Sequence, residues 1–231
     1  MPEPIVFLHG LLCDRRLFAA QAAVLAGTTE LFFPELTQDG TIAAMAERVL
    51  AQAPPRFALV GLSMGGYVAF EVLRQAPRRV TRLALLDTQA RADTEKAKAR
   101  RRGLMQLAEK GRFQGVSPRL LPLFLHPDRL DEAELTGVVQ AMARDTGKDA
   151  FLRQQTAIMG RPDSRPGLSA IACPTLVLAG REDAITPPDR QLEMAHAIPD
   201  ATLVLLPRCG HLAPLERPEA VTAQLTAWLR G

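Results

Sequence analysis

Short apolar runs recur along this chain, and segments of helical length separate them. A strand buried between two layers of helices has this pattern, because it is apolar on both faces. The runs occupy residues 5–8, 31–33, 57–60, 83–86, 175–179 and 202–206. Apolar spacing of three and four residues predicts helices over 17–25 and 42–53. Three further segments, 67–75, 188–197 and 218–229, also look helical, the first between a glycine pair and Pro77 and the second directly after Pro187. The alternation predicts a doubly wound α/β fold with a mostly or wholly parallel sheet of about six strands.

The alternation is interrupted once, between residues 88 and 170. No strand pattern occurs there, and helical patterns cover roughly 93–110, 118–125, 131–143 and 148–159. We interpret 88–170 as a helical cap inserted into a core made of 1–87 and 171–231. Because this insertion leaves and rejoins the sheet between two strands, we expect it over the carboxyl edge of the sheet, where open α/β sheets bind ligands.

Composition excludes several classes of protein. Hydrophobic residues make up 47% and charged residues 23% of the 231 residues, which rules out wholesale disorder. The net charge is only +3, and the densest basic run, 96–102, contains no aromatic residue, so we expect no nucleic-acid partner. No apolar run approaches the roughly 20 residues that span a bilayer. The first residues lack the pattern of a signal peptide. We therefore expect a cytoplasmic protein without a membrane partner.

The three cysteines, Cys13, Cys173 and Cys209, indicate free thiols in a reducing compartment rather than a disulfide framework. They form no Cys-x-x-Cys pair and no cluster with histidine at zinc spacing, so we expect no metal site.

The segment from Gly61 to Gly66 reads Gly-Leu-Ser-Met-Gly-Gly, and it follows a predicted strand and precedes a predicted helix. In that context Gly-x-Ser-x-Gly is a nucleophile elbow, a turn sharp enough to hold its serine in strained backbone geometry. Gly61 and Gly65 leave room for the turn. The sequence therefore predicts Ser63 as a nucleophile above the sheet edge. No Gly-Lys-Ser/Thr or Gly-x-Gly-x-x-Gly pattern supports a nucleotide site here.

A serine hydroxyl needs a base, and the base needs an acid to orient it. His211 follows the last predicted strand and opens onto the same sheet edge as Ser63, so it is the candidate base. Of the other histidines, His9 is expected to shape its loop, His126 to lie in a solvated loop or line a pocket, and His196 to lie on a helix.

Asp183 follows the strand at 175–179 and precedes His211, which gives the chain order Ser, Asp, His that is typical of one hydrolase class. It is the preferred acid, with Asp87 and Glu182 as competitors. An oxyanion hole requires two donors. We expect them to be the backbone N–H groups of Met64, directly after the nucleophile, and of Leu11, in the loop after the first strand.

Four segments together resemble the α/β-hydrolase fold superfamily over essentially the whole chain. They are Phe-Leu-His-Gly-Leu-Leu at 7–12, Gly-Leu-Ser-Met-Gly-Gly at 61–66, Gly-Arg-Glu-Asp at 180–183 and Gly-His at 210–211. The first two segments are similar to those of small bacterial carboxylesterases, 3-oxoadipate enol-lactonases and MenH-like proteins that release pyruvate. The resemblance implies the same roles for Ser63, Asp183 and His211, and for Leu11 and Met64. It also implies that Glu216 organises the last helix.

Many members of that superfamily begin with a β-hairpin, for which this chain has no room before residue 5. We therefore expect a trimmed sheet whose edge strand is covered by a helix or by a second copy, so that the protein is a monomer or a homodimer. A serine at the elbow argues against dehalogenase and epoxide hydrolase chemistry, for which the family uses aspartate.

These observations predict a serine hydrolase that cleaves small carboxylic esters through an acyl-enzyme, without a metal or organic cofactor. Leu12, His126 and Leu212 are candidates for the substrate pocket. Two alternatives use the same triad, a MenH-like lyase and an enol-lactone or C–C hydrolase. The lyase would need arginines in its pocket to hold carboxylates, for which the insertion offers Arg112, Arg119, Arg129, Arg144 and Arg153. A non-catalytic ligand-binding receptor is the remaining alternative.

Overall fold

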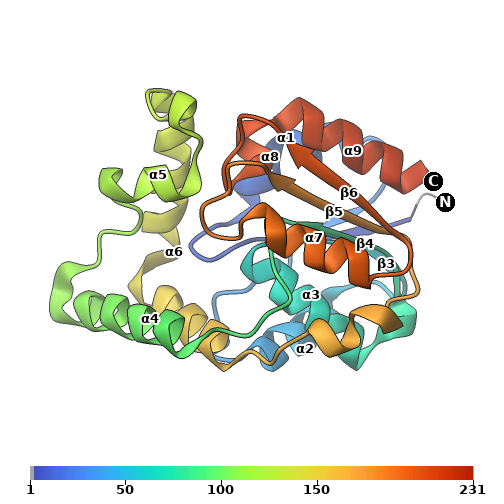
Figure 1. Cartoon of the computed structure of the whole chain (residues 1–231), viewed down its shortest axis with the longest axis horizontal. Coiled ribbons are helices and arrows are strands. Elements are labelled where there is room, and N and C mark those ends of the chain that lie inside the picture. The colour runs from blue at the N-terminus through green and yellow to red at the C-terminus, as the bar shows by residue number, and fades with distance from the viewer. Residues whose placement is uncertain (1–2, 231) are drawn as a thin grey trace.

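The fold is a parallel sheet with helices on both faces (Figure 1). The structure, a computed structural model, describes residues 3–230, apart from the side chain of Arg112. Six strands form one sheet in the order β2-β1-β3-β4-β5-β6, and every neighbouring pair is parallel. The strands are β1 (Ile5–Leu8), β2 (Leu31–Phe32), β3 (Phe57–Leu62), β4 (Val80–Leu86), β5 (Thr175–Gly180) and β6 (Ala201–Leu206). This architecture confirms the predicted fold class.

The alternation of side chains along each strand divides the core into two layers. In β1, Ile5 and Phe7 join one buried cluster, and Val6 and Leu8 join the other. The first cluster packs under α1 (Ala19–Leu25) and α9 (Pro218–Arg230), and the second under α2 (Ile42–Gln52), α3 (Met64–Gln75) and α7 (Pro188–Ala197). Because both faces are covered, all four residues of β1 are fully buried.

Local sequence determines where the flanking helices begin. The Thr41 hydroxyl accepts a hydrogen bond from Ala44 N–H at 3.1 Å and caps α2, as an N-cap threonine should. The helix expected from residue 17 is split, because Asp14 caps a short 3-10 helix, Arg15–Phe18, before α1 begins. A one-turn helix, α8 (Ala213–Glu216), precedes α9.

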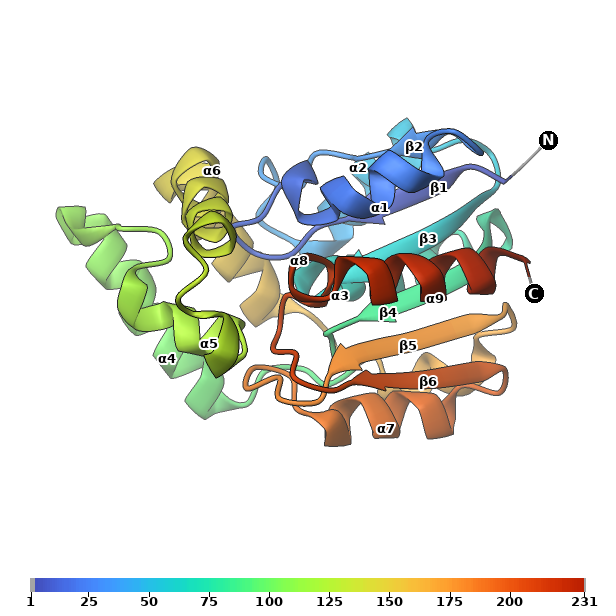
Figure 2. The same cartoon turned by 90° about the horizontal axis from the view of Figure 1, so that it is seen from above.

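The inserted helices group at one end of the sheet, beyond the carboxyl ends of the strands (Figure 2). They are α4 (Glu95–Leu107), α5 (Leu121–Phe124) and α6 (Ala133–Gly160). Gly147, with φ 79° and ψ 173°, breaks α6 into two arms. The helices lie within the predicted insertion 88–170, whose boundaries as a domain stay a prediction. Within residues 3–230, no helix combines the length and apolarity that crossing a membrane requires.

Candidate active site

Ser63 occupies the turn between β3 and α3, with φ 52° and ψ −112°. Its N–H donates to the carbonyl of Leu86 at 3.0 Å, and its own carbonyl accepts from the Thr88 hydroxyl at 2.7 Å. These bonds fix both sides of a backbone conformation that is unfavourable for a residue with a side chain. The turn therefore projects the half-buried Ser63 side chain from the sheet edge at the N-terminus of α3.

Two glycines make this turn possible because neighbouring backbone occupies the space of a side chain. A Cβ on Gly65 would lie 2.0 Å from the carbonyl oxygen of Leu8, and a Cβ on Gly61 would lie 2.6 Å from that of Gly65. Neither contact can be relieved by moving a flexible side chain. The close approach of α3 to the sheet thus explains the glycines on either side of the serine.

The structure brings Ser63, His211 and Asp183 into one hydrogen-bonded series. His211 Nε2 lies 2.9 Å from Ser63 Oγ, and His211 Nδ1 lies 2.8 Å from Asp183 Oδ2. His211 and Asp183 are each only 3% exposed, so water competes little for these bonds. With the neutral tautomer protonated at Nδ1, the ring donates to the carboxylate and its Nε2 accepts from the serine hydroxyl.

Asp183 is held ionised by its surroundings. Its Oδ1 accepts from the N–H groups of Ile185 and Thr186 at 2.8 and 3.0 Å, and its Oδ2 accepts from the Thr186 hydroxyl at 2.7 Å. Burial opposes the charge, but His211 and the Thr186 donors outweigh it, so the pKa of Asp183 lies below the usual aspartate value. Thr186 was not anticipated from the sequence, although its spacing three residues after an aspartate is a local capping pattern.

The two competing acids have other partners. The Glu182 side chain is on the exposed surface and accepts from Cys209 N–H at 3.0 Å. Asp87 is fully buried, and its two oxygens accept from Gly180 N–H at 2.9 Å and Ala213 N–H at 3.2 Å. Asp87 therefore joins the end of β5 to the segment just after His211, and Asp183 is the carboxylate that contacts the imidazole.

Glu216 has contacts beyond the role expected for it at the last helix. Its fully buried carboxylate accepts from Gly210 N–H at 2.8 Å and from His126 N–H at 2.7 Å. The His211 N–H donates to the carbonyl of Phe124 at 2.8 Å. These contacts could not be predicted, because a sequence segment next to a helix does not reveal which distant backbone groups face it. Glu216 ties the His211 loop to the insertion.

The two expected oxyanion donors lie at the start of α3 and in the turn after β1. Met64 is the first residue of α3, so its N–H has no acceptor within the helix. Leu11 lies in the turn after β1, and a Cβ on the preceding Gly10 would be 3.5 Å from the Ser63 Cβ. Within residues 3–230, neither the Leu11 nor the Met64 N–H donates to a protein acceptor. Both groups are therefore available to an oxygen atom beside Ser63.

The other histidines lie in different environments. His9 is buried, and burial lowers the pKa of its imidazole. The His9 Nδ1 lies 3.1 Å from the carbonyl oxygen of Gly10. The His126 ring accepts from Asp128 N–H at 3.1 Å and serves the local turn rather than reaching Ser63. His196 is exposed near the end of α7.

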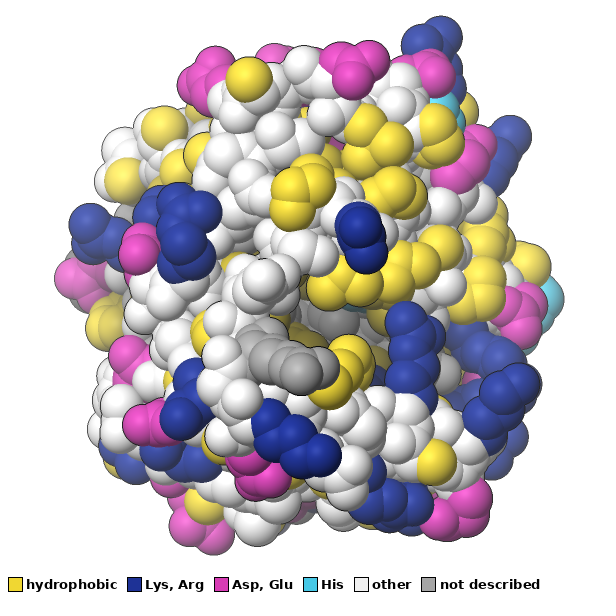
Figure 3. Space-filling view, turned by 90° about the vertical axis from the view of Figure 1, so that its left-hand side faces the viewer, with side chains coloured by type: hydrophobic (Ala, Val, Ile, Leu, Met, Phe, Trp, Pro, Cys, Tyr) yellow, Lys and Arg dark blue, Asp and Glu magenta, His cyan; other side chains and the backbone are white. Residues whose placement is uncertain are grey.

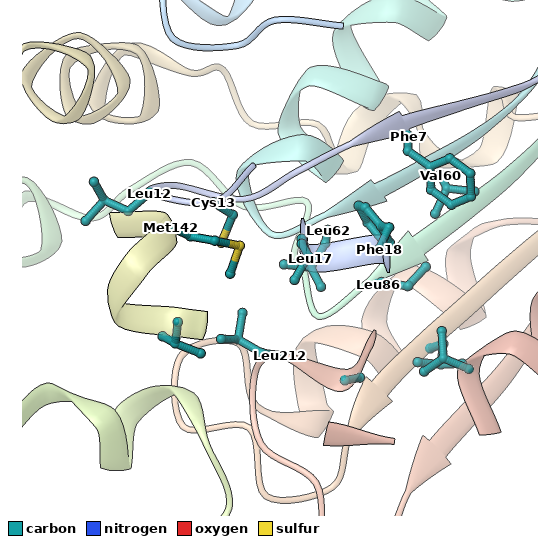
Figure 4. Close-up of a cluster of buried hydrophobic side chains, with 14 of the residues drawn as sticks. Phe7, Leu12, Cys13, Leu17, Phe18, Val60, Leu62, Leu86, Met142 and Leu212 are labelled. Atoms are coloured by element: carbon teal, nitrogen blue, oxygen red, sulfur yellow. The ribbon is translucent and has the colours of Figure 1, made fainter. Parts of the chain in front are cut away.

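Apolar side chains surround the space between the sheet edge and the insertion. Leu12 and Leu212, both expected in the pocket, are 7% and 2% exposed and belong to one buried cluster with Met142 of α6. Figure 4 shows Met142 beside Leu12 and Cys13, with Leu212 facing them. The face that carries the insertion is hollowed near its centre, with hydrophobic side chains beside the hollow and Lys and Arg around it (Figure 3). The cluster therefore joins the insertion to the loops on either side of the candidate site.

Within residues 3–230, we find no second centre built on Cys13, Cys209 or a metal-binding cluster. Burial raises the pKa of the Cys13 thiol to about 12 and raises that of Cys209 further, so neither is a thiolate at neutral pH. In the part of the chain that the structure describes, no three His, Cys, Asp or Glu side chains cluster so as to hold a metal ion.

The sequence matches the model of the alpha/beta hydrolase family over residues 5–224. The chain belongs to this family. An esterase from Thermogutta terrifontis, solved with malate bound, superimposes with a TM-score of 0.90 and is 34% identical, with 99% of this chain and 89% of that chain covered. The enol-lactonase from Burkholderia xenovorans LB400 superimposes with a TM-score of 0.85 at 26% identity, with 100% and 92% covered.

A third relative is the pimeloyl-[acyl-carrier protein] methyl ester esterase of Nitrosomonas europaea. It is 29% identical over 181 residues, which are 76% of this chain and 72% of that protein. By their names, all three of these proteins cleave an ester or a lactone, but each acts on a different molecule. The family assignment therefore identifies a hydrolase, and its substrate has to be argued from the site.

Proposed function

We propose that this hydrolase is a serine esterase that cleaves small carboxylic esters through an acyl-enzyme on Ser63. The observation that carries the proposal is the hydrogen-bonded series Ser63–His211–Asp183 at a strained strand-to-helix turn. This arrangement has the geometry by which a base activates a serine and an acid orients the base.

In the proposed reaction, His211 Nε2 takes the Ser63 proton as Ser63 Oγ attacks the ester carbonyl. The N–H groups of Leu11 and Met64 hold the oxyanion, and each such donor is typically worth about 3 kcal/mol of barrier. The imidazolium, stabilised by Asp183, then protonates the departing alcohol. Water attacks the acyl-enzyme with His211 as base, which releases the acid and restores Ser63. The cycle needs no metal and no organic cofactor.

The environment of the insertion arginines supports an ester over a substrate with several carboxylates. Arg129 donates to the Glu216 carbonyl and pairs with Glu132. Arg153 donates to the Thr37 carbonyl at 2.8 Å. Arg119 and Arg144 are exposed, and the Arg112 side chain lies outside the described part. Arg129 and Arg153 thus have protein partners, which leaves fewer arginines for the carboxylate clamp that the lyase alternative requires.

Hydrolysis of p-nitrophenyl acetate and butyrate tests the proposal, with a panel of lactones beside them. We expect turnover by the wild type and a loss of at least about 10³-fold in kcat for Ser63→Ala, because the nucleophile is gone. Ser169→Ala, at an exposed serine, is the matched control and should retain full activity. A folded wild type without turnover on any ester or lactone would contradict the proposal, as would an active Ser63→Ala.

A further inference from the structure

The loop after β1 is held in a turn that its sequence does not favour. Cys13 N–H donates to the Gly10 carbonyl at 3.2 Å, and Leu12, the third residue of this turn, has φ 60°. Leu11 has no positive φ, so the turn is of type II, whose third position is normally glycine. A side chain in this left-handed region costs roughly 1–2 kcal/mol. Some other contact must therefore hold Leu12 in place.

Gln154, in the second arm of α6, provides that contact. Its Oε1 accepts from Leu12 N–H at 3.1 Å, and its Nε2 donates to the Leu36 carbonyl at 3.2 Å. The side chain is fully buried, so water cannot replace it at either position. A buried amide between two loops is costly unless both of its ends are satisfied, and here both are.

We propose that Gln154 is a positioning residue for the oxyanion hole. The inference rests on the proposed function, in which the Leu11 N–H is one of the two donors. The Leu12 N–H belongs to the peptide group directly after Leu11, and it reaches Gln154 only in the type II orientation. Without that acceptor the peptide is free to turn over, which returns Leu12 to negative φ and rotates the backbone at Leu11. The Leu11 N–H belongs to the preceding Gly10–Leu11 peptide, whose carbonyl accepts from Cys13 across the same turn, so a loosened turn also frees the direction of the Leu11 N–H.

Gln155 is a matched control within the same helix. It is 2% exposed, and its Oε1 accepts from Arg101 at 2.8 Å instead of from the Leu12 loop. Replacing either glutamine by methionine removes a buried amide and its hydrogen bonds while keeping the length of the side chain. The two variants therefore share a loss of stability and differ in the contact with Leu12.

The first measurement is the split between kcat and KM on p-nitrophenyl butyrate. We expect Gln154→Met to lower kcat by roughly tenfold to a hundredfold and to leave KM within about twofold, since the oxyanion forms only in the transition state. Gln155→Met should keep kcat within about twofold. An unchanged kcat in Gln154→Met, or an equal loss in Gln155→Met, would overturn the inference.

The second measurement does not depend on ester turnover. An alkyl fluorophosphonate forms a bond from Ser63 Oγ to phosphorus, fluoride leaves, and His211 takes the serine proton, while the phosphoryl oxygen occupies the oxyanion hole. We expect phosphonylation, followed by intact mass, to be slowed in Gln154→Met and not in Gln155→Met. If the wild type is phosphonylated but cleaves no ester, the proposed substrate class fails, and this comparison still decides the role of Gln154.

A rescue separates positioning from packing. Glycine at position 12 adopts positive φ without strain. In a Leu12→Gly background we therefore expect Gln154→Met to cost at most about threefold in kcat. An equally large cost in both backgrounds would rule out the turn as the cause.

If Gln154→Met does not fold, Gln154→Glu replaces it. Its oxygen still accepts from Leu12, although the Leu36 carbonyl loses its donor. The inference therefore requires a folded Gln154→Glu to keep kcat within about fivefold of the wild type, and a larger loss would contradict it.

Discussion

At the scale of single residues, two neighbouring buried carboxyl groups behave in opposite ways. Burial, and then the charge of Asp183, raise the pKa of Asp87 well above the usual aspartate value, whereas the contacts of Asp183 lower its own. Asp87 also has φ 42° at the end of β4. Asp87 is thus a strained and desolvated residue that connects Gly180 to Ala213, on either side of the proposed site.

The raised pKa of Asp87 predicts a pH dependence of stability. Because the folded state retains the proton to higher pH than the unfolded chain does, the contribution of Asp87 to the free energy of unfolding falls as pH rises from about 4 through its raised pKa. Asp87→Asn lacks this titration. We expect the free energy of unfolding of the wild type, relative to that of Asp87→Asn, to be lower at pH 7.5 than at pH 4.5 in urea titrations. A difference that is constant or that grows with pH would contradict this.

The sequence was sufficient to select candidate site residues that directly follow a strand. Ser63, Asp183 and His211 each follow a strand of a parallel sheet, and the carboxyl ends of such strands meet at one edge, so they were selected together. Gln154 gave no signal, because its partner Leu12 is 142 residues away and a glutamine in a helix has no distinctive pattern.

At the scale of elements, the glycines near Ser63 led to wrong predicted boundaries for one strand and one helix. The strand expected to end at residue 60 continues to Leu62, because Gly61 and Leu62 pair with Leu85 and Leu86 of β4. The helix expected from residue 67 begins at Met64. The low helix propensity of glycine argued against a helix at Gly65 and Gly66. In the structure both lie in α3, where they are glycine because a Cβ would collide with Leu8 or Thr88.

The contact between α8 and the insertion is testable through Glu216. Glu216→Gln leaves one oxygen for two N–H donors, Gly210 and His126, so one donor faces an amide NH₂. We expect a loss of about 1–3 kcal/mol in the free energy of unfolding and about tenfold in kcat, because the His211 loop loses a support. Urea unfolding and ester kinetics measure both. Glu219→Gln, at an exposed glutamate of α9, should change neither, and an equal effect there would refute the role of Glu216.

At the scale of the whole molecule, a buried ion pair joins the two ends of the insertion. Arg161 and Asp93 approach to 2.7 Å with side chains 3% and 4% exposed. Arg161 also donates to the Arg91 carbonyl and lies over the Tyr67 ring at 4.1 Å. The two chain ends of the insertion thus meet at α3. The sequence predicted where the sheet pattern stops and resumes, but it contained no sign that these ends pair with each other.

Removing one partner of this pair should be costly. We expect Arg161→Met to lower the free energy of unfolding by about 3 kcal/mol, because Asp93 is left as a buried charge with fewer partners. The double variant Asp93→Asn/Arg161→Met should lose less than the two single variants together. Arg165→Met, which breaks the exposed pair with Asp163, should have little effect. Additive losses in the double variant would show that the pair does not act as a unit.

The insertion supplies the Phe124 carbonyl to His211, the His126 N–H to Glu216 of α8, and Gln154 to the turn at Leu12. This has a consequence for recombination between relatives. A chimera that imports residues 88–170 from another member of the family acquires a new pocket, but it keeps a working centre only if the donor segment carries the same three hydrogen-bonding groups in register. Exchange of substrate range within this fold is therefore constrained by backbone support as well as by the shape of the pocket.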